Sequence, residues 1–198
     1  MSSGLLTTRE RILTAALSLV NQAKGPIAMS AIAKGAGVSR QALYLNFADK
    51  ADLFIALVRF VDERRGLPEE LAKIRGAPSG TAALLAMVDL QARLNPDLQP
   101  LVEALELLRR QDPAAEQAWQ DRLANRLDGC REIVARMAEE RTLRSDLDLR
   151  VASDLVWSIT SLRMWDDLVV QRGWTAAEYR ERVTKLLFSS VISQVPPS

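Results

Sequence analysis

Apolar residues recur every three or four positions over most of the chain, which is the spacing of one face of an α-helix. The first such segment begins at Thr7 and Glu10, spaced as a capping box, and is expected to end at Gly25-Pro26. No repeats and no convincing strands occur, so the pattern predicts an all-α fold. The later helices are expected at 29–36, 39–47, 49–65, 80–94, 98–110, 113–140, 148–171 and 175–193.

Glycine and proline divide the chain into two parts. The stretches "GLPEE" and "RGAPSG" interrupt the helical pattern between residues 66 and 80. We therefore expect an N-terminal three-helix domain over residues 6–66 and a C-terminal helical domain over residues 67–198. Within the second domain, "NPDLQP" is expected to separate two helices, and Asp112-Pro113 places a capping residue before a first-turn proline.

Composition excludes several classes of protein. The chain has 198 residues, 48% of them apolar, which is enough to bury a core. It lacks an apolar stretch of about 18 residues that could span a bilayer, and it does not begin with the basic-then-apolar order of a signal peptide. We therefore expect no membrane partner and a cytoplasmic location.

Cysteine and histidine usage limits the chemistry further. There is no histidine, and the single cysteine, Cys130, cannot form a disulfide within the chain. The usual metal sites and His-based catalytic triads are therefore excluded, and we expect no cofactor. Cys130 lies on the apolar face of the helix predicted at 113–140, so we interpret it as a core residue rather than a nucleophile.

Charge is distributed unevenly along the chain. Residues 1–50 contain six basic and two acidic residues, a net charge of +4, although the whole chain carries only +1. A basic segment of this kind suits a surface that binds phosphate, but it is also common on solvated helices. Charge alone does not decide between the two.

The stretch "GVSRQALYLNF", residues 37–47, has the spacing of a helix-turn-helix when taken with the helix before it. Gly37 suits the turn, Ala33 is a small residue where two helices cross, and Leu43 is an apolar anchor. In such a unit the second helix enters the major groove of DNA with its N-terminal residues toward the bases. This explains why long polar side chains begin such a short helix.

The side chains at these positions suit DNA. Gln41 has the donor and acceptor needed for an adenine edge, Arg40 can fork onto a guanine or clamp a phosphate, and Ala42 leaves room for a thymine methyl group. Tyr44 and Lys50 suit phosphate contacts that fix the register. The expected DNA-binding residues are Ser30, Ser39, Arg40, Gln41, Ala42, Tyr44, Asn46 and Lys50.

At these residues the chain resembles the tetracycline-repressor (TetR) family of bacterial transcriptional regulators. The resemblance is carried by "RERILTAALSLV", by "IAMSAIAKGAGVSRQALYLNFADKADLF" and by the spacing of Tyr44, Phe47 and Lys50. It covers about residues 6–66, whereas the C-terminal half, including "LRSDLDLRVASDLVW", is similar only in layout. The resemblance implies a homodimeric repressor with an effector pocket in its C-terminal domain and a dimer interface in its last two helices.

Three positions depart from the family pattern. Ala28 stands where a threonine or serine commonly caps the second helix, and Ser30 is expected to replace the missing oxygen in part. Gln41 stands at a position that is frequently small or glycine, and Asn46 at a common histidine. These departures concern the operator sequence more than DNA binding itself.

The helices predicted at 148–171 and 175–193 are apolar on more than one face, which indicates that more than one neighbour covers them. We expect them to pair with their copies in a symmetric four-helix dimer interface. A central position in a monomer remains the alternative. The expected interface residues are Leu155, Leu162, Trp165, Val183 and Leu187.

The effector pocket is expected among the middle helices. Its candidate residues are Met87, Trp119, Trp157 and Arg163. Aromatic and methionine residues at helical spacing are more often core residues. Arg163 can instead pair with Asp166 or Asp167, one turn further along.

The predicted function is a dimeric DNA-binding transcriptional regulator. A dimer binds a palindromic operator when its two reading helices lie one DNA turn apart, about 34–36 Å. A small-molecule effector that prefers another separation releases it. An enzyme is disfavoured, because the carboxylates are scattered and "EE" at 139–140 is a run of charge. An all-helical sensor or adaptor without DNA binding stays the alternative, and it would show no salt-dependent affinity for any duplex.

Overall fold

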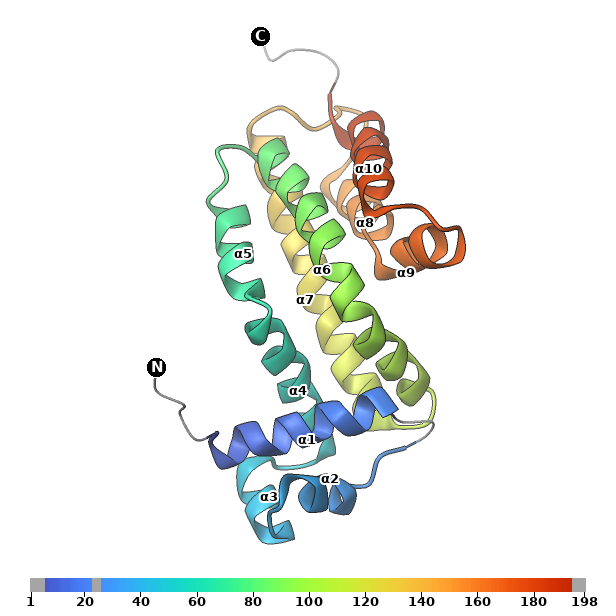
Figure 1. Cartoon of the computed structure of the whole chain (residues 1–198). Coiled ribbons are helices and arrows are strands. Elements are labelled where there is room, and N and C mark those ends of the chain that lie inside the picture. Colours follow the sequence, from blue (N-terminus) through green and yellow to red (C-terminus); the bar gives the residue numbers. More distant parts are fainter. Residues whose placement is uncertain (1–5, 23–25, 194–198) are drawn as a thin grey trace, which may run out of the picture. The chain divides into compact units, whose positions relative to one another are not determined.

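The computed structural model describes residues 6–22 and 26–193, with residues 97, 100 and 104 described by their backbone alone. This part of the chain is all-α, as the periodicity predicts, with an isolated antiparallel bridge between Leu143 and Ile192. None of its helices is long and apolar enough to cross a membrane. The elements in Figure 1 are α1 (Thr8–Gln22), α2 (Met29–Ala36), α3 (Arg40–Asn46), α4 (Lys50–Arg64), α5 (Leu67–Arg75), α6 (Gly80–Arg109), α7 (Pro113–Glu139), α8 (Leu149–Ile159), α9 (Leu162–Trp165), the π-helical segment η1 (Asp166–Gln171) and α10 (Ala176–Val191).

Local capping explains where the N-terminal helices begin. The N–H of Glu10 donates to Thr7 Oγ1 at 3.2 Å and that of Thr7 donates to Glu10 Oε2 at 2.8 Å, so the predicted capping box is confirmed. Ser39 and Asp49 cap α3 and α4, because the side chain of each accepts a backbone N–H from the first turn of its helix. The predicted end of the first helix at Gly25 lies outside the described residues.

The chain is more helical between residues 66 and 110 than the sequence predicts. The helix α5 forms where a break was expected, because Pro68 lies in its first turn, where a missing N–H costs nothing. Similarly, α6 runs unbroken through "NPDLQP", so the prediction of two helices here is wrong. Its buried residues Leu98, Leu101 and Leu105 continue one apolar face through this segment and beyond it. Their burial outweighs the roughly 3 kcal/mol that a proline costs inside a helix.

The single helix predicted at 148–171 is also wrong, because the chain breaks after Ile159. Thr160 ends α8, and Ser161 begins α9 by accepting the N–H of Met164 at 3.1 Å. Arg126 supplies the reason for the break. Its guanidinium donates to the carbonyl oxygens of Thr160 at 3.0 Å and Trp157 at 2.5 Å, which satisfies helix-end acceptors that a longer helix would use itself.

Packing divides the chain into two compact units. Unit 1 consists of Met1–Arg65 and Leu98–Arg122, and unit 2 of Gly66–Asp97 and Leu123–Ser198. Residues 98–122, which the sequence assigns to the C-terminal domain, therefore pack with unit 1. The helices α6 and α7 each contribute residues to both units. The functional division at residues 66 and 67 stays a prediction.

The core of unit 2 is formed largely by α6, α7, α8 and α10. Trp165 and Tyr179 meet edge to face in it, with ring centroids 4.8 Å apart. Burial raises the pKa of Tyr179 to about 12. Cys130 is fully buried there, and burial raises the pKa of its thiol, so its predicted role as a core residue is confirmed.

Candidate nucleic-acid interface

Two arginines of α1 hold the helix-turn-helix, in which α1 packs on α2 and α2 on α3 (Figure 1). Arg11 Nη2 donates to the carbonyl oxygens of Ala36 at 2.8 Å and Gly37 at 3.1 Å, at the end of α2. Arg9 Nη1 donates to the carbonyl oxygen of Asn46 at 2.7 Å, at the end of α3, and its guanidinium lies 4.3 Å from the centroid of the Phe47 ring. Cations favour helix C-termini, so α1 positions both helices.

Sequence reasoning missed this role. Both arginines were assigned only to a basic segment, and the carbonyl groups that they contact come from residues 25 and 37 positions further along the chain. No local spacing signals contacts of that range.

The turn between α2 and α3 depends on Gly37, whose φ of 65° lies in the left-handed region. We expect Gly37→Ala to lower the free energy of unfolding by about 1–2 kcal/mol, because a Cβ strains this conformation. The Cβ would also lie 3.3 Å from Arg11 Nη2. Thermal unfolding measures the loss. Gly35→Ala is the matched control, because its Cβ would meet Ala15 at an ordinary 3.5 Å and alanine favours a helix. Equal losses in both variants would contradict this explanation.

The recognition helix α3 presents two exposed rows of side chains. Leu43, only 1% exposed, anchors the helix in unit 1. Gln41 and Leu45 lie two residues to either side of it, about 200° around the helix, so both face away from the core. Arg40 and Tyr44 form the second row, four residues apart.

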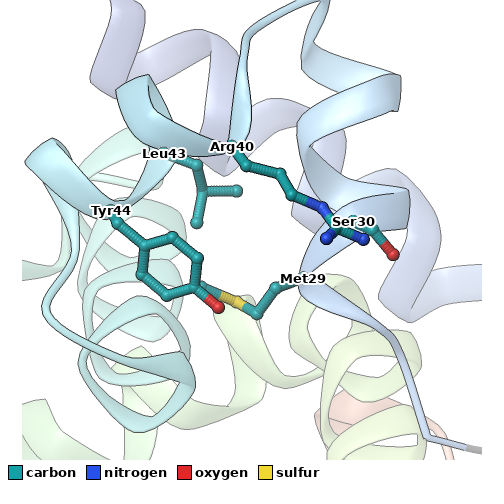
Figure 2. Close-up of a pocket in the computed structure, with 5 residues that line it drawn as sticks. All are labelled: Met29, Ser30, Arg40, Leu43 and Tyr44. Atoms are coloured by element: carbon teal, nitrogen blue, oxygen red, sulfur yellow. The ribbon is translucent and has the colours of Figure 1, made fainter.

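The second row lines a pocket of about 240 Å³ between α3 and the start of α2. Figure 2 shows the guanidinium of Arg40 extending toward Ser30 and the phenol ring of Tyr44 beside Met29. Ala28 precedes α2 in an extended conformation and gives it no side-chain cap. A helix N-terminus, a cation and two hydroxyl groups are suitable donors for the oxygens of one phosphate group.

The remaining predicted residues of α3 have roles within the helix. Ser39 Oγ accepts the N–H of Ala42 at 3.0 Å, and Asn46 Nδ2 donates to the carbonyl oxygen of Ala42 at 2.8 Å. Ala42 and Asn46 are half-buried, whereas Ser39 is exposed. Ser39 and Asn46 therefore stabilise α3 itself, and a DNA contact by either residue would be a second role.

Lys50 has a partner in the protein. Its ammonium group lies against the carboxylate of Asp112, and the two side chains are 25% and 6% exposed. Asp112 also caps α7, because its Oδ1 accepts the N–H of Ala114 at 3.1 Å. The pair joins the starts of α4 and α7 within unit 1. Lys50 is therefore not a free cation, and a DNA phosphate would have to compete with Asp112 for it.

We expect Lys50→Ala to lower the free energy of unfolding by about 2–4 kcal/mol, because it leaves a buried carboxylate without its cation. Adding Asp112→Asn should restore much of the loss, since the amide carries no charge and still caps the helix. Thermal unfolding of the single and double variants tests this. An unchanged stability, together with a weaker salt dependence of DNA binding, would instead assign Lys50 to phosphate contact alone.

The four predicted effector residues belong to two different units. Trp119 is in unit 1, where the guanidinium of Arg109 lies 5.3 Å from its ring centroid. Unit 2 contains the others: Met87 and Trp157 are half-buried against its core, and Arg163 is exposed. The indole Nε1 of Trp157 is buried and has no hydrogen-bond acceptor among the described residues.

Three of the predicted dimer residues are already covered by their own chain. Trp165, Val183 and Leu187 are at most 2% exposed and belong to the core of unit 2. Their place in the interface stays a prediction, and in it they would support the contacting side chains from within the core. Leu155 and Leu162 are only half-buried.

On α10, the exposed large apolar side chains are Leu186 and Phe188, at 39% and 40% exposure. They flank the buried Leu187, one residue to either side. No group of three or more His, Cys, Asp or Glu side chains in the described part of the chain could hold a metal ion.

Comparisons with known proteins agree with this geometry. A family model described as "Bacterial regulatory proteins, tetR family" matches residues 12–57, which span most of α1 through most of α4. No curated protein sequence matches the chain.

Solved structures show a similar fold over nearly the whole chain. The transcriptional regulator FadR from Bacillus subtilis, in complex with stearoyl-CoA, is 21% identical with a TM-score of 0.71, covering 90% of this chain and 97% of its own. NalD of Pseudomonas aeruginosa, the secondary repressor of the MexAB-OprM multidrug efflux pump, is 23% identical with a TM-score of 0.68. The match covers 96% of this chain and 98% of NalD. The complex of SmeT with triclosan is 21% identical with a TM-score of 0.69, covering 96% of each chain.

Proposed function

We propose that this chain, a transcriptional regulator whose N-terminal domain belongs to the tetR family of bacterial regulatory proteins, binds a palindromic operator as a dimer and represses transcription until a small molecule releases it. The observation that carries the DNA-binding part is the pair of exposed rows on α3, one of which borders a pocket lined by Arg40, Ser30 and Tyr44. In this role it acts in the cytoplasm and catalyses no reaction.

Different residues at the two rows contact the bases and the phosphates of DNA. Gln41 and Ala42 contact base edges in the major groove, since they lie in the first turn of the recognition helix. Ser30, Arg40 and Tyr44 hold a phosphate at the pocket and thereby fix the register. Ser39, Asn46 and Lys50 are secondary contacts, each already bonded within the protein.

The dimer forms through α8 and α10, which pack on each other within one chain. Val151 and Leu155 are half-buried and lie four residues apart on α8. Leu162 on α9 and Phe188 on α10 are further apolar side chains that their own chain leaves partly exposed, and we call these four residues the apolar stripe. An apolar stripe of this kind is typical of the interface between two-helix halves of a symmetric four-helix bundle.

The effector binds in unit 2, and Trp157 carries this part of the proposal. Its buried indole N–H lacks an acceptor among the described residues, and a bound molecule would supply one. Met87 and Arg163 belong to the same unit. FadR and SmeT were solved with stearoyl-CoA and triclosan, respectively, which favours a small-molecule effector here. Because α6 and α7 contribute to both units, a shift of either helix reaches α4 through Asp112 and Lys50.

Selection of duplexes from a random pool, at two salt concentrations, tests the proposal. A palindrome with half-sites about one DNA turn apart, bound more weakly at higher salt, is the expected result. Recovery of no sequence by folded protein would overturn DNA binding and favour a helical sensor instead.

A further inference from the structure

Leu45 is the most exposed large apolar side chain in the described part of the chain, at 79% exposure. The others reach at most 54%, and the next is its neighbour Tyr44. It lies in a helix of seven residues, among polar side chains, where its side chain contributes almost no buried apolar area to the fold. Exposure of this degree, inside the recognition helix, leaves the side chain of Leu45 available for an external contact.

The geometry of α3 places Leu45 on the DNA-facing side. It is four residues from Gln41, so the two side chains are neighbours on one face, opposite the buried Leu43. Arg40 and Tyr44 lie on the adjacent face, at the pocket. Leu45 is therefore in the row proposed for base contacts, not in the row proposed for phosphate.

We propose that Leu45 is a specificity-determining residue, which contacts the C5 methyl group of a thymine in each operator half-site. This inference rests on the proposed function. Leucine has no donor or acceptor, so the only base-edge feature of the major groove that it can recognise is an apolar one. Thymine alone among the four bases supplies it.

The same chemistry rejects other bases at that position. A cytosine amino group covered by Leu45 loses its hydrogen bond to water and gains none from the protein. Gln41 satisfies a polar base edge beside it. The row therefore reads two adjacent features of different kinds, one polar and one apolar.

Replacement of each operator thymine by 2′-deoxyuridine, symmetrically in both half-sites, tests the contact, because uracil pairs as thymine does but lacks the methyl group. Burial of one methyl group corresponds to about a fourfold change in affinity. When the contacted thymine is replaced in both half-sites, we expect the affinity of the wild-type protein for the operator to fall about 16-fold. Leu45→Ala should bind the unmodified operator about as weakly as wild type binds the modified one, and should lose little more on modification. Leu45→Met should lose affinity on deoxyuridine replacement as the wild type does, because methionine is also a large apolar side chain.

Leu107→Ala serves as the matched control, because Leu107 is also an exposed leucine of unit 1, at 43% exposure, outside the recognition helix. It should leave the sensitivity to deoxyuridine unchanged. If Leu45→Ala loses as much affinity on modification as wild type, another residue such as Ala42 contacts the methyl group and the inference is overturned. The same holds if no thymine is sensitive. Failure of wild type to bind any duplex would instead overturn the proposed function.

Discussion

Gln41→Ala is expected to lower the preference for the operator over unrelated duplex by at least about 30-fold. A bidentate contact to one base contributes about 1–3 kcal/mol of discrimination, and a dimer makes it twice. Gln41 is exposed and faces away from the core, so its removal leaves the fold intact. Titration of operator and scrambled duplex with the variant measures the ratio of the two affinities.

Arg40→Ala provides the contrast, since it is in the same turn of α3 but in the row at the pocket. It should weaken binding to all sequences alike and reduce the salt dependence by about one unit for each half-site. A change in base preference would show instead that Arg40 contacts a guanine. An unchanged ratio in Gln41→Ala would remove Gln41 from the base-contacting set.

Conversion of the dimer into a monomer is the second large effect that we expect. Leu155→Glu and Phe188→Glu each place a charge in the proposed stripe, twice in a symmetric interface. Burial of an unpaired carboxylate costs several kcal/mol, which exceeds what the remaining contacts of the stripe can offset. Sedimentation equilibrium at micromolar concentration should therefore give the mass of one chain, and operator affinity should fall with it.

The choice of positions decides whether this experiment reports on the interface. A charge at Val183 or Leu187 would enter the core of unit 2 and unfold it. Leu155 is only partly buried against that core and Phe188 is exposed, so of the two variants Phe188→Glu separates assembly from folding more cleanly. Leu71→Glu is the control, because Leu71 is exposed to a similar degree, 37%, but lies on α5. It should stay dimeric. Dimers in both Leu155→Glu and Phe188→Glu would refute the stripe.

The helix-turn-helix could be predicted from the sequence because short-range interactions determine it. The turn at Gly37, the cap at Ser39 and the anchor Leu43 lie within seven consecutive residues, and the hydrogen bonds of the turn and the cap join residues three or four positions apart. The spacing also identified which residues of α3 begin the helix. The same kind of local signal predicted the capping box of α1.

Periodicity predicted less well where distant residues decide the outcome. It failed to show that α6 continues past two prolines, because the stabilisation that offsets the prolines comes from burial of α6 residues against other helices. It failed to show that α8 ends at Ile159, because the carbonyl groups there bind Arg126 of α7. Two equally apolar faces of α10 looked alike in the sequence, and only packing distinguished the buried one.

The sequence by itself determined the fold class, the helix-turn-helix and the residues that begin its recognition helix, since these follow from contacts of a few residues' range. Only the tertiary structure decided that Arg9 and Arg11 hold that unit, that Asp112 occupies Lys50, and that Leu45 stands exposed beside Gln41. The physical reason is that burial and long-range pairing depend on which segments meet. The pattern of apolar residues along the sequence indicates which residues can be buried, but it does not indicate which segments they pack against.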